Sequence, residues 1–280
     1  MEPAIQNDFF KDGFFGYGES GNFQPWSIAH IIPLLFLCLG ISLIYAFRKR
    51  IANAKHEENI RYVIAILMLF FEMSYFWRLL YVGSGSTDEK NLLCKLPLQV
   101  CEWTCIFGSI MLIKKSKNLC DICFYTCLSA GLFPLLFPAV ISTAGPRYFR
   151  YYQYWAEHIL PIFAVFYMVF VHGYRPKLIN IYKPFLFLFT LAIFASIANY
   201  YIPSADYLYL ANNTKGLTIT NWLPQNVFLK LFVLSILFVC VFVIIYFVYR
   251  LIIFLYAKAN LNKEASKVSQ EWNLHWLLAI

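Results

Sequence analysis

Charged residues are scarce in this sequence. Asp, Glu, Lys and Arg together make up 14% of its 280 residues, whereas 60% of the residues are hydrophobic. A soluble domain needs far fewer apolar side chains to build a core, so this scarcity excludes a soluble globular protein. The mean hydropathy of +0.60 agrees. The sequence therefore predicts an all-α integral membrane protein, folded as a polytopic helix bundle.

Sequence motifs that bind cofactors are also lacking. There is no GxGxxG motif, no Walker motif and no metal-ligand array in the chain, so nothing in it points to a cofactor. Cys120, Cys123 and Cys127 share one helical face, but no histidine lies nearby to complete a zinc site. We expect neither a cofactor nor a metal. Most of the eight cysteines lie in or beside apolar runs, so we also expect no disulfide framework.

The N-terminus lacks both a basic start and a cleavage site, so it does not have the features of a signal peptide. A net charge of +8 is compatible with nucleic acid as a partner. The basic residues, however, form short clusters between apolar runs, which argues against nucleic acid. We predict an extracytoplasmic segment over residues 1–26, a transmembrane domain over 27–256 and a cytoplasmic tail over 257–280.

Seven apolar runs are long enough to cross a bilayer, because about 20 helical residues span its hydrocarbon core. Lys and Arg cluster after the first, third, fifth and seventh runs. The positive-inside rule therefore predicts an N-terminus outside and a C-terminus in the cytoplasm. The seven predicted spans are residues 27–47, 61–82, 96–113, 119–141, 155–171, 184–200 and 228–256.

This orientation places polar side chains from four spans in the outer half of the membrane. An ionisable side chain at membrane depth costs about 2.5 to 3.5 kcal/mol on insertion scales, and it indicates a functional site by default. The cytoplasmic half holds few comparable groups. The outer groups are His30, Glu72, Arg78, Cys101, Glu102, Glu157 and His158.

Cys101 and His158 are the candidate nucleophile and base. A thiolate is the reactive form of cysteine, and a histidine at hydrogen-bond distance accepts the thiol proton. At the depth of the outer leaflet, the natural electrophile is a lipid acyl ester. The third group that would orient the imidazole stays open among His30, Glu72 and Glu102.

Each of these residues also has a structural interpretation. A membrane cysteine is more often inert than reactive, and His158 can instead hydrogen-bond across the bundle. Glu72 and Arg78 fit a structural ion pair, although six residues separate them along the helix and neighbours on other spans are the better partners. Arg78 equally suits bidentate binding of a lipid phosphate. Glu157 is predicted to be an exposed residue at the rim.

Several short segments carry a resemblance along most of the chain. The most distinctive are LPLQVC, which ends at Cys101, and RYYQYWAEH, which ends at His158. The others are SIAH at 27–30, FFEMSY around Glu72, GLFPLLFP at 131–138 and ANYYIPSADYLYL at 198–210. With these segments the sequence resembles the YwaF-like family of bacterial membrane proteins, which is related to the eukaryotic transmembrane protein 164 acyltransferases.

The resemblance implies a bundle of six or seven spans in the bacterial cytoplasmic membrane, with membrane phospholipids as partners. It also implies acyl transfer between phospholipids, with Cys101 and His158 in the catalytic roles. Two departures bear on the choice of acceptor. Asp206 stands where the resemblance leads us to expect Asn, and NWLPQN at 221–226 stands in place of a Gly-Pro-Trp-Pro-like segment.

Two interpretations of function thus remain open. One is a lipid acyltransferase that moves a fatty acyl group from a phospholipid to a lysolipid or a similar hydroxyl, and the same site would be a lipid hydrolase with water as the acceptor. The other is a binding, transport or sensor protein whose polar outer cavity captures a ligand without covalent chemistry. The sequence identifies no protein partner.

Overall fold

The computed structural model describes residues 13–15, 23–82, 96–138, 145–202, 205–211, 223–224 and 226–277, without the side chains of 78–82, 256–257 and 259–277. In this part of the chain the secondary structure is entirely helical, with no strand. The all-α prediction is therefore confirmed.

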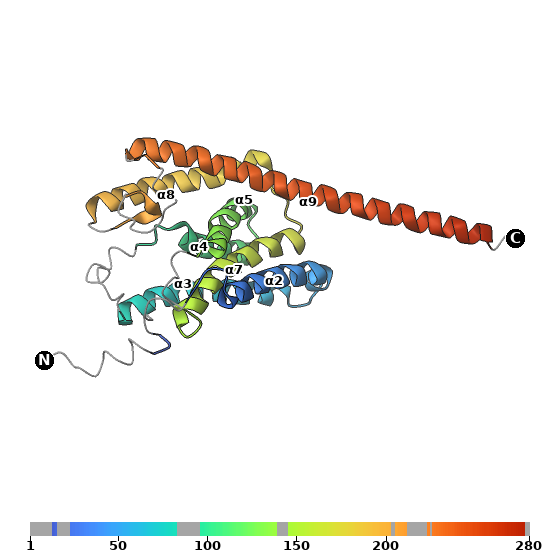
Figure 1. Cartoon of the computed structure of the whole chain (residues 1–280), viewed down its shortest axis with the longest axis horizontal. Helices are drawn as coiled ribbons and strands as arrows, with labels where there is room; N and C mark the ends of the chain where they lie inside the picture. The colour runs from blue at the N-terminus through green and yellow to red at the C-terminus, as the bar shows by residue number, and fades with distance from the viewer. Residues whose placement is uncertain are drawn as a thin grey trace.

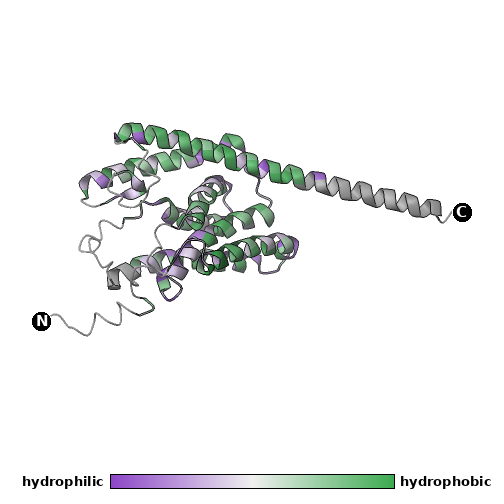
Figure 2. Cartoon of the chain, in the orientation of Figure 1, coloured by the Kyte–Doolittle hydropathy of each residue, from purple (hydrophilic) through white to green (hydrophobic). Residues whose placement is uncertain are grey.

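Five helical segments among the described residues are long and apolar enough to cross a membrane, so the chain is a multi-pass membrane protein. Figure 2 shows hydrophobic colour along α2, α8 and the coloured part of α9, and many large apolar side chains of the five segments are exposed. Such faces suit contact with lipid. The segments are α2 (Ile28–Ala52), α3 (Glu57–Val82), α5–α6 (Lys117–Thr126, Cys127–Gly131 and Leu132–Leu136), α8 (Tyr182–Tyr201) with the short helix η4 (Leu178–Ile181) before it, and α9 (Val227–Leu277).

The other two predicted spans correspond to α4 (Val100–Lys114) and α7 (Phe149–Phe170), which are not among these five segments. Helix α4 has 15 residues, or about 22 Å, which is shorter than a hydrocarbon core of about 30 Å. Helix α7 has 22 residues but carries several buried polar side chains. These two helices nevertheless lie at the centre of the molecule.

Helices α3, α4 and α7 pack against one another and form the core. Helix α2 covers α7, α5 packs on α4, and α8 packs on α5. Figure 1 shows α8 and α9 along one side of this core, with α9 continuing well beyond the bundle towards the C-terminus. The predicted last span thus continues as a helix to Leu277.

Contacts between α2 and α7 show how proline and glycine set this packing. Pro33 in α2 has no N–H for the carbonyl of Ala29, and the Tyr151 hydroxyl of α7 donates to that carbonyl. About two turns beyond Pro33, Gly40 lets the Phe163 ring approach so closely that a Cβ at this position would lie 2.2 Å from the ring. The Phe163 ring of α7 therefore packs directly on the backbone of α2 at Gly40.

Two predicted boundaries differ from those of the structure for local reasons. The predicted fourth span extends to residue 141, but α6 ends at Leu136, because Pro138 disfavours helical conformation in the residue before it. The predicted fifth span begins at 155, but α7 begins at Phe149. Its first turns, RYYQY, are polar and aromatic, so hydropathy alone does not reveal them.

Candidate active site

A cavity of about 670 Å³ lies among α3, α4, α5–α6, α7, α8, α9 and the short helix η5 (Tyr207–Tyr209). Its size falls within the range of ordinary ligand sites, which is about 300 to 1,000 Å³. Both candidate catalytic residues, Cys101 and His158, line it. Segments far apart in the sequence thus meet around one space.

The lining of this cavity is amphipathic. The polar side chains gather from α3, α4 and α7 and the segment just before α4, whereas α8 and α9 supply mostly apolar ones. The polar group includes Tyr75, Gln99, Cys101, Glu102, Arg150, Tyr154, Glu157 and His158. The apolar group includes Phe185, Leu188, Phe189, Ala192, Leu231, Leu234, Leu237, Phe238 and Val241.

Cys101 lies in the first turn of α4 and is partly buried. One turn later on the same helical face, Cys105 Sγ lies 3.4 Å from the backbone oxygen of Glu157. That oxygen is free because Pro161 has no N–H to bond it. The cysteine face of α4 therefore packs on α7 at Glu157, and the Glu157 carboxyl neighbours the Cys101 thiol. In the described part of the chain, no hydrogen bond joins Cys101 to His158.

His158 is buried, and its Nδ1 has no hydrogen-bond partner among the described residues. The Tyr154 ring packs edge-on against the imidazole, with the centroids 4.6 Å apart. The Tyr154 hydroxyl in turn donates to the carbonyl of Pro134, 2.7 Å away. That carbonyl is available because Pro138, four residues later, has no N–H. A proline-rich turn of the chain thus fixes the aromatic wall beside the imidazole.

Glu157 is only 6% exposed, so its prediction as an exposed rim residue is wrong. Gln153 Nε2 donates to Glu157 Oε2 at 2.6 Å and to the carbonyl of Phe71 at 3.2 Å. Arg150 Nη1 lies 3.6 Å from the same carboxyl oxygen. The error arose because hydropathy places a charged residue of α7 at the membrane surface, whereas packing of α7 in the core buries it.

Glu102 caps the start of α4, and Gln99 joins this start to residues 205–211. The Glu102 Oε2 accepts from the backbone N–H of Gln99 at 2.9 Å, as half of a capping box. The Gln99 Oε1 accepts from the backbone N–H of Leu208 at 3.3 Å, and the Tyr207 hydroxyl contacts the Leu96 N–H at 2.7 Å. The segment 205–211 therefore covers the start of α4 directly beside Cys101.

This covering segment, residues 205–211, has an unusual backbone. Leu208 and Tyr209 both adopt left-handed φ angles, 54° and 56°, which residues with a Cβ rarely do. Asn199 holds the segment with two hydrogen bonds to the backbone of Tyr207. Asp206, which stands where the resemblance leads us to expect Asn, accepts from the N–H of Ala211 through Oδ1. Its Oδ2 is buried without a hydrogen-bond partner among the described residues.

Glu72 is 3% exposed and lies behind the cavity wall. Its Oε2 has no hydrogen-bond partner among the described residues, and Glu102 and Glu157 are its charged neighbours of like sign. The predicted partner, Arg78, has its side chain outside the described residues, so both predictions for Arg78 stay predictions. Three carboxyl groups from α3, α4 and α7 are thus brought together.

The structure does not bring His30 to this cavity. Its Nδ1 accepts from the backbone N–H of Trp26 and its Nε2 donates to the carbonyl of Leu135, both at 2.8 Å. This arrangement requires the proton on Nε2. With both nitrogens used, the ring ties the start of α2 to the end of α6, and the Trp155 ring packs beside it.

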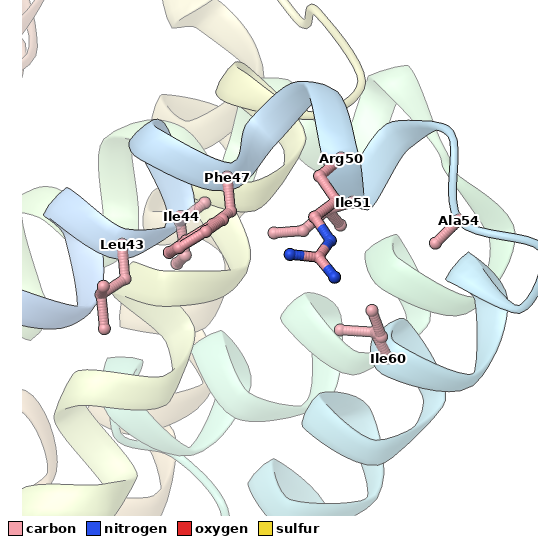
Figure 3. Close-up of a pocket in the computed structure, with 7 residues that line it drawn as sticks. All are labelled: Leu43, Ile44, Phe47, Arg50, Ile51, Ala54 and Ile60. Atoms are coloured by element: carbon pink, nitrogen blue, oxygen red, sulfur yellow. The ribbon is translucent and has the colours of Figure 1, made fainter.

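A second concave region lies between the end of α2 and the start of α3, and Figure 3 shows the residues that line it. Its volume is about 430 Å³, and Arg50 is the one charged side chain in its lining. Cys120, Cys123 and Cys127 are buried and free. Within the described ranges, no group of three or more His, Cys, Asp and Glu side chains is placed to hold a metal ion.

Sequence reasoning missed Arg150, Gln153 and Tyr154 as parts of the site. A signal was present, because residues 150, 153, 154 and 157 recur at helical spacing and lie on one face of a helix. The aromatic residues between them instead favoured an interfacial belt.

Fold and cavity together define a multi-pass helical membrane protein with an amphipathic cavity at its core. The chain matches the TMEM164 family over residues 25–267. It therefore belongs to this family. Comparison with curated proteins and with solved structures found no match.

Proposed function

We propose that this protein is a lipid acyltransferase that forms a thioester on Cys101. The donor is a phospholipid, and the acceptor is a lysolipid or a similar hydroxyl compound. One observation carries the proposal: a thiol and an imidazole line the same cavity, whose other side is apolar along α8 and α9, and the imidazole Nδ1 has no hydrogen-bond partner among the described residues. Membership of a family related to acyltransferases supports it.

The amphipathic lining fits an acyl ester in orientation as well as in composition. The cavity-lining residues of α9 run from Leu231 to Val241, a distance of about 15 Å along the helix. A hydrocarbon chain can lie along this wall with its ester carbonyl among the polar side chains of α4 and α7. Closure of the cavity by residues 205–211 would limit the access of water.

In the proposed reaction, His158 takes the Cys101 thiol proton and the thiolate attacks the ester carbonyl. The C–O bond breaks, the fatty acyl group stays on sulfur, and the leaving alkoxide takes the proton from His158. In the second half, His158 removes the proton of the acceptor hydroxyl, which attacks the thioester. The C–S bond breaks and the thiol is restored. Water as the acceptor would release a fatty acid.

The separation of Cys101 from His158 in the hydrogen-bond network bears on this mechanism. Catalytic hydrogen bonds are often long without substrate and shorten when it binds. Glu157 currently neighbours the thiol, and His158 Nδ1 is without a partner in the described part of the chain. In our proposal, the donor lipid brings the two catalytic groups together.

For topology, we propose that α4 and α7 cross the membrane together with the five segments named above. The N-terminus is then outside, the C-terminus is in the cytoplasm, and the membrane is the bacterial cytoplasmic membrane. Basic residues after α2, α4, α7 and in the last part of α9 support this orientation.

The test is acylation of the purified protein in lipid nanodiscs, measured by intact mass. We expect an acyl adduct on the wild type, none on Cys101→Ala, and formation slowed by about 10²-fold or more in His158→Ala. Cys105→Ala is the matched control, because it removes a thiol one turn away, and it should retain the adduct. Equal labelling of all variants, with the fold intact, would refute the catalytic proposal and favour a binding protein.

A further inference from the structure

Among the described residues, Arg150 is the one Lys or Arg side chain that lines the cavity. It is the second residue of α7, and its side chain is 15% exposed. The guanidinium carbon lies 4.3 Å from the centre of the Tyr75 ring, a favourable cation–π arrangement. Its charge is thus held within the cavity wall rather than at the protein surface.

One edge of the guanidinium is already engaged. Arg150 Nη1 donates to Gln153 Oε1 and lies 3.6 Å from Glu157 Oε2. Gln153 also donates to Glu157. The three residues are spaced three and seven apart on α7, so one face of the helix presents them together. This arrangement fixes the plane of the guanidinium before any ligand arrives.

The other edge is free. A guanidinium has five N–H donors, and Arg150 Nε and Nη2 have no hydrogen-bond partner among the described residues. Neither nitrogen is one of the sealed, unpartnered atoms of this part of the structure, and Arg150 lines the cavity. A ligand that accepts two parallel hydrogen bonds would use both donors at once.

Carboxyl groups elsewhere in the cavity restrict which ligand can do so. Glu157 lies on the occupied edge of Arg150, and Glu102 caps the backbone of Gln99. They disfavour an anion anywhere except on the free edge of the guanidinium. The apolar wall of α8 and α9 demands a hydrocarbon chain. The match is an amphiphile with a phosphate group, because phosphate binds the guanidinium fork bidentately.

We propose that Arg150 binds the phosphate of the lipid that occupies this cavity and selects phosphate-bearing lipids over neutral ones. The role of this lipid as the substrate rests on the proposed function, whereas its binding at Arg150 does not. Arg150 is a substrate-binding residue in this scheme, and Gln153 and Glu157 position it.

The experiment measures binding in the Cys101→Ala background, where no acyl transfer takes place, by native mass spectrometry in nanodiscs. The probes are palmitoyl lysophosphatidylglycerol, monopalmitoylglycerol and inorganic phosphate. Adding Arg150→Gln should weaken binding of the lysophospholipid at least about tenfold and leave the monoglyceride unchanged. Arg150→Lys, which keeps the charge but loses the fork, should fall between the two. Arg147→Gln is the matched control, because Arg147 is exposed at the same end of α7, and it should bind like its parent.

Competition separates the two sources of phosphate. If inorganic phosphate displaces the lysophospholipid at equal concentration, the ligand is free phosphate and the lipid half of the proposal is overturned. If Arg150→Gln weakens both lipids equally, or neither, Arg150 is not a phosphate site. Thermal unfolding of each variant excludes misfolding, and Arg150→Lys decides the matter if Arg150→Gln fails to fold. The acyl adduct is measured separately, in the intact-mass experiment on proteins that retain Cys101. Failure of the catalytic proposal is therefore distinguishable from failure of the phosphate-binding proposal.

Discussion

Two buried carboxylates, Glu57 and Glu157, lie at different ends of the α3–α4–α7 core, and their surroundings differ. Glu57 accepts from Arg61 Nε at 2.9 Å and from the Tyr167 hydroxyl at 2.7 Å, and His172 Nε2 lies 2.9 Å away. Lys115 approaches to 3.4 Å. Cations thus outnumber the single carboxylate in this Glu57 cluster, which consists of the five residues just named.

The Glu157 cluster, which consists of Glu72, Glu102, Arg150, Gln153 and Glu157, has the opposite balance. It holds three carboxyl groups and one guanidinium, borders a cavity, and leaves Glu72 Oε2 without a hydrogen-bond partner among the described residues. A fully satisfied polar network rigidifies a fold, whereas one with unmet groups has lower stability. We interpret the Glu57 cluster as a structural cluster that stabilises the core. We interpret the Glu157 cluster as part of the candidate active site.

The largest expected effect is on the free energy of unfolding, after a change in the Glu57 cluster. Glu57→Gln should lower the free energy of unfolding by about 3 kcal/mol or more, because it leaves the buried Arg61 without its charge partner. The matched change Glu72→Gln should lower it by less than about 0.5 kcal/mol, since an oxygen without a hydrogen bond is replaced. Thermal unfolding in nanodiscs at pH 7 compares the two. Similar losses of stability in both variants would contradict the distinction between the structural Glu57 cluster and the Glu157 cluster of the candidate site.

A pair of tyrosines gives the next effect. Tyr167→Phe removes a donor to the charged Glu57 and should cost about 2 kcal/mol, whereas Tyr154→Phe removes a donor to the Pro134 carbonyl and should cost about 1 kcal/mol. Acyl adduct formation should slow only in Tyr154→Phe, because Tyr154 packs on His158. Slower adduct formation in Tyr167→Phe would show that the two ends are coupled.

Helix caps offer a finer comparison. Gln99→Ala removes the side chain that joins α4 to Leu208, and Ser116→Ala removes the N-cap of α5, which lies away from the cavity. Each should cost about 1 kcal/mol of stability. Adduct formation should slow about fivefold in Gln99→Ala, which corresponds to about 1 kcal/mol, and stay unchanged in Ser116→Ala. Equal rates in the two variants would show that residues 205–211 do not matter for activity.

The smallest expected effect is a pH dependence of stability that arises in the Glu57 cluster. Burial lowers the pKa of His172, although the hydrogen bond and charge of Glu57 act against this. The unfolded chain then takes up the proton first, near pH 6.5, so stability should fall as the pH drops from 7 towards 5.5. His172→Gln should flatten this fall, and His56→Gln should not, because His56 is exposed. Melting curves at three pH values test it, and parallel curves for all three proteins would contradict it.

Much of this architecture follows from hydropathy. Five of the predicted spans correspond to segments long and apolar enough to cross a membrane, because an apolar run of that length must bury its backbone in a helix. Helices α4 and α7, which correspond to the other two predicted spans, are not among these five segments. Their polar residues are stabilised by neighbours on other helices. A hydropathy value summed over one segment takes no account of those neighbours.

The site shows the same division. Segments that end at Cys101 and His158 carried the resemblance to the family, and both residues line one cavity. Placement of Glu157 at the rim was wrong, and His30 lies apart with both nitrogens engaged. Arg150 was missed. These outcomes depend on which face of α7 turns inward, which local sequence does not state.

By itself, the sequence determined an all-helical membrane protein and the polar residues that any fold must accommodate, because both follow from the cost of exposing polar groups to hydrocarbon. Only the tertiary structure decided which of these residues meet. The carbonyl freed by Pro161 receives the thiol of Cys105, and this contact sets α4 against Glu157 rather than His158. Partners of this kind lie far apart in the chain, and packing alone brings them together.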